Sequence, residues 1–407
     1  MTSIEKRIAR ELEAARESGL VRGLRGVESL SARECLVGAP PRKCLDFSSN
    51  NYLGLSDDPR LKDESVRWTE RYGTGSRASR LVSGTSPFVL ELEERVAEWK
   101  GFESALIFGS GHMANLGAVP ALVGRGGAVF ADRLNHASLN DGCRLSGARF
   151  FRYRHADSGD LEEKLDSFLS RALAKGSDTD YRSSSSAELL VVSDTVFSMD
   201  GDVADVAGIA DAARGRGALV YFDDAHATGV FGERGEGLAS PVNADVAMGT
   251  FSKGLGCHGA YVACSRRLRD WLVNKCGSFV YSTAPPPSVY GAISAALDLM
   301  ETDEFRGKRA ELLAVSAETA RRIRDLGFDV GKTATPIIPV VVGKAEDAVG
   351  MSRALLERGI FAPAIRPPTV PRGSARLRVS LNAAHTGRDL DALVGALGEV
   401  AKHGTPT

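Results

Sequence analysis

Short apolar runs alternate with stretches of helical periodicity through the middle of the chain. Seven such runs lie at residues 105–108, 128–131, 149–151, 189–192, 219–222, 246–249 and 260–263. Runs without regular polar positions are typical of strands that are buried on both faces of a sheet. Strands that alternate with helices predict an α/β fold, with a mostly parallel sheet covered by helices on both faces.

The two ends of the chain follow other patterns. Ile4, Ile8 and Leu12 recur every four residues between charged positions, which predicts a short amphipathic helix that docks as an arm. After three prolines and a helix over residues 288–300, strands alternate with helices again, which predicts a compact C-terminal α/β domain. The strands are expected near residues 337–342 and 375–381, and the helices near 348–358 and 390–402.

A chain of 407 residues exceeds one typical domain. We expect an N-terminal helical arm and small segment over residues 1–50, a large domain over 51–290 and a small domain over 291–407. The stretch 176–187 contains four consecutive serines and interrupts the strand and helix series, so it is predicted to be an exposed loop.

Charge and composition favour a small-molecule enzyme. The formal net charge is −1, whereas binding to nucleic acid usually needs a clustered basic face. Six cysteines are scattered without a Cys-x-x-Cys pair, a pattern that indicates neither a zinc knuckle nor a disulfide framework. Because no apolar run reaches the roughly eighteen residues that span a bilayer, and the N-terminus is rich in Glu and Arg, we expect a cytoplasmic protein without membrane contact.

The strongest chemical signal is Lys253, which follows an apolar run and has nearby glycines that let a ligand approach the backbone. An earlier run ends in the same way at Asp223 and His226. Open α/β sheets bind ligands at such strand ends. An amine, a carboxylate and an imidazole there suit pyridoxal 5'-phosphate (PLP), which needs a Schiff-base lysine, a partner for its pyridinium nitrogen and tuning of its phenolic oxygen. Each residue alone is a weak signal, since a lysine after a strand is more often solvated.

A phosphate site is suggested by the glycine-containing segment 109–112, which follows a predicted strand and precedes a predicted helix. The first amides of such a helix bind anions. An ordinary glycine turn explains the same residues, so the segment alone leaves both interpretations open.

Three competing motifs fail on their context. The segment 73–78 fits a Gly-x-Gly-x-x-Ala dinucleotide pattern, but a charged helical stretch precedes it where that pattern requires a strand. The segment 109–111 lacks the Gly-x-Ser-x-Gly spacing of a hydrolase nucleophile. Asp223 and His226 have no accompanying His or Cys cluster that completes a metal site.

Five motifs lie at residues 48–55, 110–115, 132–138, 196–202 and 223–226. In order and spacing they resemble the motifs of the α-oxoamine synthases, a family of PLP enzymes that condense an amino acid with an acyl-CoA and release carbon dioxide. The resemblance extends from about Arg22 to the last helix. It implies the fold type I of PLP-dependent transferases, similar to aspartate aminotransferase, with a large domain and a smaller C-terminal one.

The resemblance implies a role for each candidate catalytic residue. Lys253 is expected to bind PLP and then to act as the general base at the amino acid Cα, which requires a neutral amine. Asp223 is expected to keep the pyridine nitrogen protonated, and His136 to stack on the ring and contact the substrate. His226 is the fourth candidate catalytic residue and, with Ser198, is expected to hydrogen-bond the phenolic oxygen of PLP. The remaining cofactor contacts that the resemblance implies are Gly111, His112, Thr250 and Thr283, with Thr283 near the phosphate of the neighbouring subunit in a homodimer.

The substrate carboxylate is expected to need a guanidinium, whose planar fork matches two carboxylate oxygens. Arg376 and Arg378 are the candidates, and because strand alternation puts both on one face, the residues themselves do not separate them. Family position favours Arg376. The resemblance also implies a substrate contact by Asn50.

The segment 364–371 resembles that of family members which join L-alanine to pimeloyl-CoA, or to a pimeloyl carrier-protein thioester, in biotin biosynthesis. Thr369 and Arg22 occupy substrate-contacting positions in this resemblance. Asp194, where Glu is frequent, and the pair 77–78 depart from the family pattern. Members that use glycine or serine stay as alternatives, since one methyl group is worth only about 1–3 kcal/mol of discrimination. A non-catalytic PLP-binding protein is a further alternative.

Overall fold

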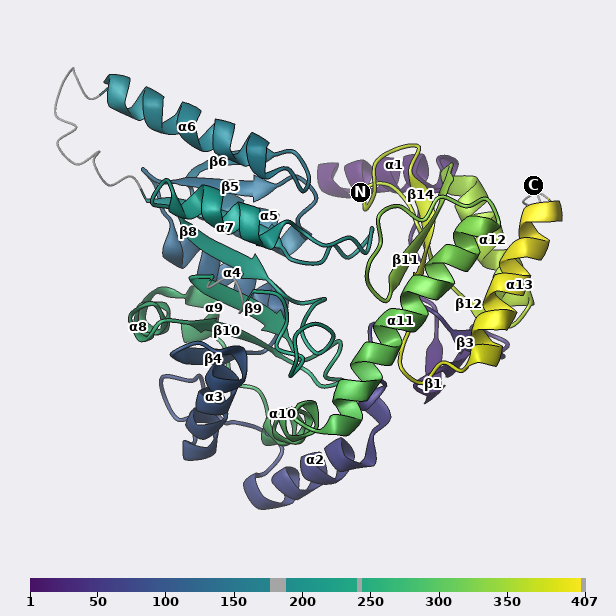
Figure 1. Ribbon diagram of the computed structural model, residues 1–407, viewed down its shortest axis with the longest axis horizontal. Helices are drawn as coiled ribbons and strands as arrows, with labels where there is room; N and C mark the ends of the chain where they lie inside the picture. Colours follow the sequence, from purple (N-terminus) through teal and green to yellow (C-terminus); the bar gives the residue numbers. More distant parts are fainter. Residues whose placement is uncertain (176–187, 240–243, 404–407) are drawn as a thin grey trace. The chain divides into compact units, whose positions relative to one another are not determined.

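The computed structural model describes residues 1–175, 188–239 and 244–403, and the predicted loop at 176–187 lies outside them (Figure 1). The chain divides into two compact units. The first comprises Met1–Asn50, Met199–Asp202 and Glu311–Thr407, and the second comprises Asn51–Ser198 and Val203–Ala310. The division after Ala310 falls inside helix α11 (Asp303–Asp325), later in the chain than the expected boundary at residue 290.

The second unit is built on a sheet of seven described strands in the order β4-β10-β9-β8-β7-β5-β6. All neighbouring pairs from β9 to β6 are parallel, and β10 runs antiparallel to both β9 and β4. The predicted mostly parallel sheet is confirmed, and each of the seven apolar runs forms one strand. The bounds are β4 Ser104–Phe108, β5 Ala128–Asp132, β6 Arg149–Tyr153, β7 Leu189–Asp194, β8 Leu219–Asp223, β9 Val246–Thr250 and β10 Ala260–Cys264.

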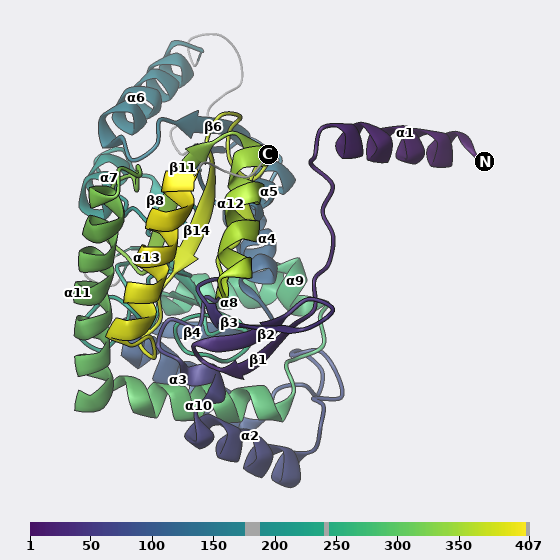
Figure 2. The same cartoon turned by 90° about the vertical axis from the view of Figure 1, so that its right-hand side faces the viewer.

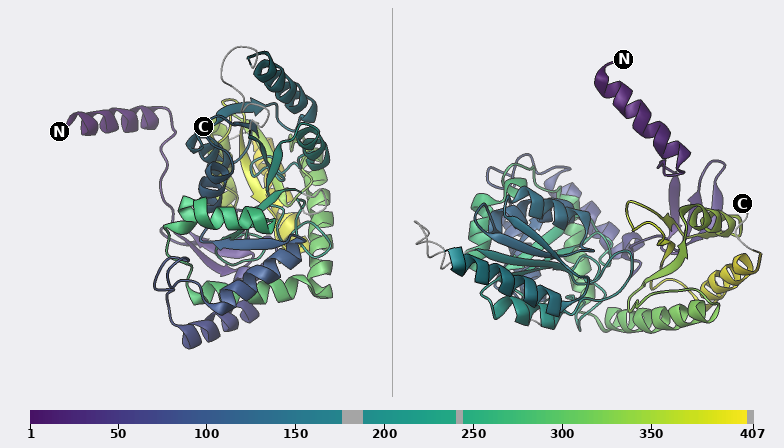
Figure 3. Two further views of the ribbon diagram at one scale, coloured as in Figure 1. Left: turned by 90° about the vertical axis from the view of Figure 1, so that its left-hand side faces the viewer. Right: turned by 90° about the horizontal axis from the view of Figure 1, so that it is seen from above.

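Helices cover both faces of this sheet (Figure 3). Successive residues of β5 point to opposite faces, so that Val129 packs in one apolar cluster and Phe130 in the other. Helices α4, α5 and α8 contribute to the Val129 cluster, and α6 and α7 to the Phe130 cluster. The helices are α2 Pro59–Tyr72, α3 Pro87–Lys100, α4 Gly111–Leu122, α5 Ala137–Leu145, α6 Ser158–Lys175, α7 Val206–Arg214, α8 Arg266–Lys275, α9 Gly277–Val280 and α10 Pro287–Met300.

The first unit contains two small sheets, in the orders β1-β2-β3-β12 and β11-β14-β13. Helices α12 and α13 lie alongside β11 and β14, as Figure 2 shows. The predicted C-terminal strands and helices are confirmed, whereas strands β1–β3 were not predicted. The bounds are β1 Val27–Ser31, β2 Glu34–Val37, β3 Arg42–Asp46, β11 Ile337–Gly343, α12 Ala345–Glu357, β12 Ile360–Phe361, β13 Ala364–Ile365, β14 Ala375–Ser380 and α13 Gly387–His403.

The chain begins with the predicted N-terminal helix, α1 (Ser3–Glu17). A capping box starts it: the Thr2 hydroxyl accepts from the Glu5 amide at 3.2 Å, and the Thr2 amide donates to the Glu5 carboxylate at 2.6 Å. No residue of α1 is buried. Among the described helices, none combines the length and apolar character needed to cross a membrane.

Candidate active site

Asp223 is the last residue of β8, near the centre of the seven-stranded sheet, and its side chain is buried. Its two carboxylate oxygens have different partners. One accepts from the Ala225 amide at 2.9 Å, and the other accepts from the Asn115 side-chain amide at 2.8 Å. Burial raises the pKa of Asp223, and the nearby Lys253 charge opposes that shift. A buried carboxylate at this strand end is suited to a cationic ligand atom.

Asn115, on α4, fixes the direction of the Asp223 carboxylate. The Tyr221 hydroxyl donates to the Asn115 carbonyl oxygen at 2.8 Å, so the Asn115 amide nitrogen faces Asp223. The same nitrogen also lies 2.9 Å from the Ser138 hydroxyl. All four side chains are buried. This hydrogen-bonded group was missed by the sequence analysis, although Asn115 ends one of the motifs that carried the resemblance.

His136 precedes helix α5 and caps it. The Ser138 amide donates to His136 Nδ1 at 3.3 Å, and the Ser138 hydroxyl lies 2.7 Å from the same atom. Because Nδ1 accepts, the proton of a neutral ring is on Nε2. Desolvation, and then the charges of Lys253 and His112, lower the pKa of His136 against the opposing effect of Asp223. The imidazole is therefore neutral at pH 7.

Asp194 holds the backbone of this segment. The His136 amide donates to its carboxylate at 2.6 Å, and the Asn135 side chain accepts from the Asp194 amide at 3.0 Å. Burial, followed by the neighbouring Asp223 charge, raises the pKa of Asp194 well above its ordinary value. Asp194, the residue that departs from the family pattern, thus contacts the backbone of His136.

His226 follows β8 and is buried. Its Nδ1 atom lies 2.7 Å from the hydroxyl of Tyr52, which is itself fully buried. This contact fixes the imidazole orientation. Tyr52 belongs to the motif at 48–55 but was not predicted as a site residue, since an aromatic side chain in a sequence is more commonly part of the core.

Two other predicted cofactor positions approach each other closely. Gly111 begins α4 and Thr250 ends β9, and a Cβ atom on Gly111 would lie 2.6 Å from the Thr250 methyl group. Only glycine fits there. The Ser110 hydroxyl caps α4 by accepting from the Met113 amide at 3.2 Å, and the amides of the first turn stay available to an anion.

Lys253 lies in a tight turn after β9. The turn is closed by hydrogen bonds from the Gly256 amide to the Lys253 carbonyl at 3.0 Å and from the Cys257 amide to the Phe251 carbonyl at 2.8 Å. Gly256 has a φ of +64°, and a Cβ atom there would lie 2.3 Å from the Ser56 backbone. The backbone that carries Lys253 is therefore fixed. The charge of the Lys253 side chain lowers the pKa of Asp223, of His136 and of Asp194.

The remaining predicted cofactor residues occupy the same unit. Ser198 is half-buried and follows the bridge residue Val196. His112 is exposed on the first turn of α4. Thr283 is exposed and forms a bridge with Ser79, and its described contacts include none of the residues around Asp223. Among the described residues, no group of His, Cys, Asp and Glu side chains could hold a metal ion.

The two candidate arginines on β14 differ in their partners. Arg376 forms an ion pair with Asp200 and donates to the Ser374 carbonyl at 3.0 Å. Arg378 donates to the Ser380 hydroxyl at 2.7 Å and to the Asn50 side-chain oxygen at 3.0 Å. The structure thus joins Asn50 to Arg378, and it gives Arg376 an acidic partner.

Arg22 and Thr369, which the family resemblance predicted as substrate contacts, meet in the first unit. The Arg22 guanidinium donates to the Thr369 hydroxyl at 2.9 Å. Arg366 supports this arrangement by donating to the carbonyls of Gly19 and Val21, the latter at 2.8 Å. The arm segment before β1 is therefore held against the segment 364–371.

A second buried carboxylate, Asp224, adjoins Asp223 and forms an ion pair with Lys100 at 2.8 Å. Both side chains are fully buried. Asp224 also accepts from the Thr195 hydroxyl at 2.6 Å and from the amides of Leu238 and Ala239 at 3.3 and 3.1 Å. The pair fixes the segment after β8 to the end of α3.

Comparisons with known proteins give one consistent result. The family model described as aminotransferase class I and II matches residues 42–397. The protein named 8-amino-7-oxononanoate synthase from Geobacter sulfurreducens is 46% identical over 399 residues, 97% of this chain and 98% of its own. A solved structure titled as SPT with a PLP internal aldimine has a TM-score of 0.87 and 27% identity, covering 99% of both chains.

A crystal structure of 8-amino-7-oxononanoate synthase from Francisella tularensis has a TM-score of 0.74, covering 88% of this chain and 98% of its own. Its identity is 24%, so this likeness shows the fold alone. Together with the family match, these structures confirm the predicted fold, similar to that of the aminotransferases.

Replacing Lys100 by Met should lower the free energy of unfolding by about 3–5 kcal/mol, because it leaves Asp224 buried without its cation. Urea unfolding followed by circular dichroism measures this change. Lys275→Met, which removes an exposed lysine, is the control and should leave stability within about 0.5 kcal/mol. A loss below about 1 kcal/mol in Lys100→Met would contradict the role given to the pair.

Proposed function

We propose that this chain, which belongs to the aminotransferase class I and II family, is a PLP-dependent acyltransferase that condenses L-alanine with a pimeloyl thioester. The products are 8-amino-7-oxononanoate, carbon dioxide and the free thiol of the carrier, a step of biotin biosynthesis. The observation that carries the proposal is the buried Asp223 carboxylate, oriented by Asn115 and acted on by Lys253. The name of the 46% identical relative supports the choice of substrates.

The described residues fit PLP. Asp223 would hold the protonated pyridine nitrogen, the first amides of α4 and Thr250 would hold the phosphate, and Ser198 and His226 would hold the phenolic oxygen. A Cβ atom at position 111 would collide with the Thr250 methyl group, so glycine is needed where these two residues would hold the phosphate. When bound, PLP supplies an electron sink for the negative charge that develops at the α-carbon of the amino acid.

The electrostatics of Asp223 match this role. Burial favours its protonated form, and a cationic ring nitrogen would favour the ionised carboxylate, as the Lys253 charge already does. Asn115 and the Ala225 amide donate to the two oxygens and hold the carboxylate in one orientation. A proton on the ring nitrogen is therefore stabilised in the place where the electron sink needs it.

Lys253 and His136 act on the reacting atoms. Lys253 removes the proton from the amino acid Cα as general base and later returns one to the product. Neutral His136 can stack on the ring without adding a second positive charge, and its Nε2 proton is available to a substrate oxygen. Asp194 positions this imidazole through the His136 amide.

The substrate carboxylate is assigned to Arg378. Its guanidinium already contacts Asn50, the other residue predicted to bind the amino acid. Arg376 is the weaker candidate, because Asp200 neutralises its charge within an ion pair that the substrate would have to break. Arg22 and Thr369 are assigned to the acyl substrate.

The Lys253→Ala variant should lose at least about a hundredfold in turnover, since it removes the general base. Thiol release by PLP-loaded protein, given L-alanine and pimeloyl-CoA or a pimeloyl carrier protein, measures this loss. Lys275→Ala is the matched control and should retain full activity. Glycine and serine run alongside L-alanine test the amino-acid choice, and an active Lys253→Ala variant would refute the mechanism.

The Arg378→Lys variant should raise the KM for L-alanine about 10–100-fold, because a lysine cannot reproduce the two parallel bonds of a guanidinium to a carboxylate. Arg376→Lys should raise it less than about threefold. Steady-state kinetics with varied alanine at saturating thioester separates the two residues. A larger effect at Arg376 would reverse the assignment.

The enzyme is further proposed to be a homodimer in which Thr283 approaches the phosphate of the other subunit's cofactor. Exposure of Thr283 on the second unit is compatible with this role. Size-exclusion chromatography with light scattering should give a mass near twice the 43.2 kDa of one chain. A fully active monomer would contradict the prediction.

A further inference from the structure

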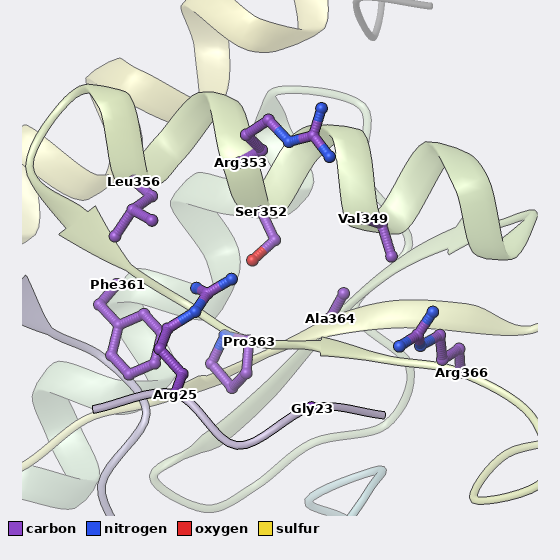
Figure 4. Close-up of a pocket in the computed structure, with 10 residues that line it drawn as sticks. All are labelled: Gly23, Arg25, Val349, Ser352, Arg353, Leu356, Phe361, Pro363, Ala364 and Arg366. Atoms are coloured by element: carbon purple, nitrogen blue, oxygen red, sulfur yellow. The ribbon is translucent and has the colours of Figure 1, made fainter. Parts of the chain in front are cut away.

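A groove with a volume of about 340 Å³ lies wholly within the first unit (Figure 4). One wall is helix α12, and the other is the segment from β12 to Arg366. The arm segment that carries Gly23 and Arg25 closes its lower edge, as Figure 4 shows. Arg22, next to Gly23, is the residue that contacts Thr369. The groove therefore adjoins the residues assigned to the acyl substrate.

Three arginines line this groove, and none of its lining residues is acidic. In Figure 4 the Arg25 guanidinium reaches up toward α12, Arg353 stands on α12, and Arg366 lies at the opposite end. Arg366 donates to two backbone carbonyls. Within the described part of the chain, no hydrogen bond or ion pair engages the side chain of Arg25 or that of Arg353. The groove thus presents positive charge that no described carboxylate neutralises.

The rest of the lining is mainly apolar. The apolar side chains belong to Val349, Leu356, Phe361, Pro363 and Ala364. Leu356 and Phe361 are held in place because they also pack on the buried cluster formed by β2 and β3. A ligand that fits both kinds of lining has an apolar chain with an anionic end.

We propose that this groove binds the distal carboxylate and the adjoining methylenes of the acyl donor, and so selects a dicarboxylic acyl chain over a monocarboxylic one. The identity of that donor rests on the proposed function. A guanidinium matches a carboxylate with two parallel bonds, and Arg25 and Arg353 are the charges available for it. The apolar side chains cover the methylenes, each of which gains about fourfold in affinity when buried.

The lining favours this occupant over the nucleotide end of coenzyme A. A volume of about 340 Å³ is at the lower end of small-molecule pockets. A ribose and a purine would also need several neutral hydrogen-bonding side chains. Ser352 is the neutral polar side chain in this lining, and its hydroxyl already donates to the Ala362 carbonyl at 2.6 Å.

The test compares pimeloyl-CoA with heptanoyl-CoA, which has the same chain length and lacks the distal carboxylate. In the Arg25→Met/Arg353→Met double variant, kcat/KM for pimeloyl-CoA should fall about tenfold or more, while kcat/KM for heptanoyl-CoA should change less than about twofold. Arg388→Met, which removes an exposed arginine of the same unit outside the groove, is the control. Equal losses for both donors would place the CoA phosphates in the groove and overturn the proposal. An unchanged kcat/KM for pimeloyl-CoA would also overturn it.

A binding measurement separates this proposal from the proposed function. Calorimetric titration of the PLP-loaded protein with free pimelate and free heptanoate needs no turnover. Pimelate should bind at least about tenfold more tightly than heptanoate, and the single variants Arg25→Met and Arg353→Met should each reduce that preference. If this holds while pimeloyl-CoA is not turned over, the proposed function fails and the groove assignment stands. Equal binding of the two acids in the native protein would overturn the groove assignment itself.

Discussion

Two adjacent carboxylates at the end of β8, Asp223 and Asp224, set the requirements for the rest of the second unit. Both are buried, and a buried carboxylate is costly unless a cation or several hydrogen bonds compensate it. Successive residues at a strand end point in opposite directions, so each carboxylate needs its own cation or hydrogen-bond donors. Asp224 is compensated from within the protein by Lys100. Asp223 receives two neutral donors and the opposing effect of the Lys253 charge, and it keeps its affinity for a cation.

This difference explains why surrounding elements are arranged as they are. Lys100 ends α3, and its reach to Asp224 ties that helix to the segment after β8. Asn115 on α4 orients Asp223, and through Ser138 it also connects to His136 at the start of α5. The chemical groups are therefore held by helices packed on the sheet, and the loops between them need little freedom. Such preorganisation is what an electrostatic contribution to catalysis requires.

Most of the sheet could be predicted from sequence because its strands are buried on both faces and lack polar interruption. The residues at the strand ends, Lys253, Asp223 and His226, could be singled out for the same reason, since polar side chains follow apolar runs there. Lys100 could not be found in this way: its partner is 124 positions away, and a lysine at the end of a helix gives no sign of burial. Strands β1–β3 were missed because their segments are only four or five residues long, and β1 and β3 also carry exposed charged residues.

Strand periodicity cannot distinguish Arg376 from Arg378, because residues two positions apart lie on the same face of β14. Their partners come from distant parts of the chain, Asp200 for one and Asn50 for the other.

The same reasoning applies to the groove beside α12. The chain contains 51 basic and 52 acidic residues, so the arginines of the groove are not part of a general excess of positive charge. Arginines that line a groove without a described acidic partner can pair with an anion that the protein does not itself supply. Where compensation is internal, as at Lys100 and Arg376, the charge holds the fold together, and where it is missing, as at Arg25 and Arg353, the charge is available to a ligand.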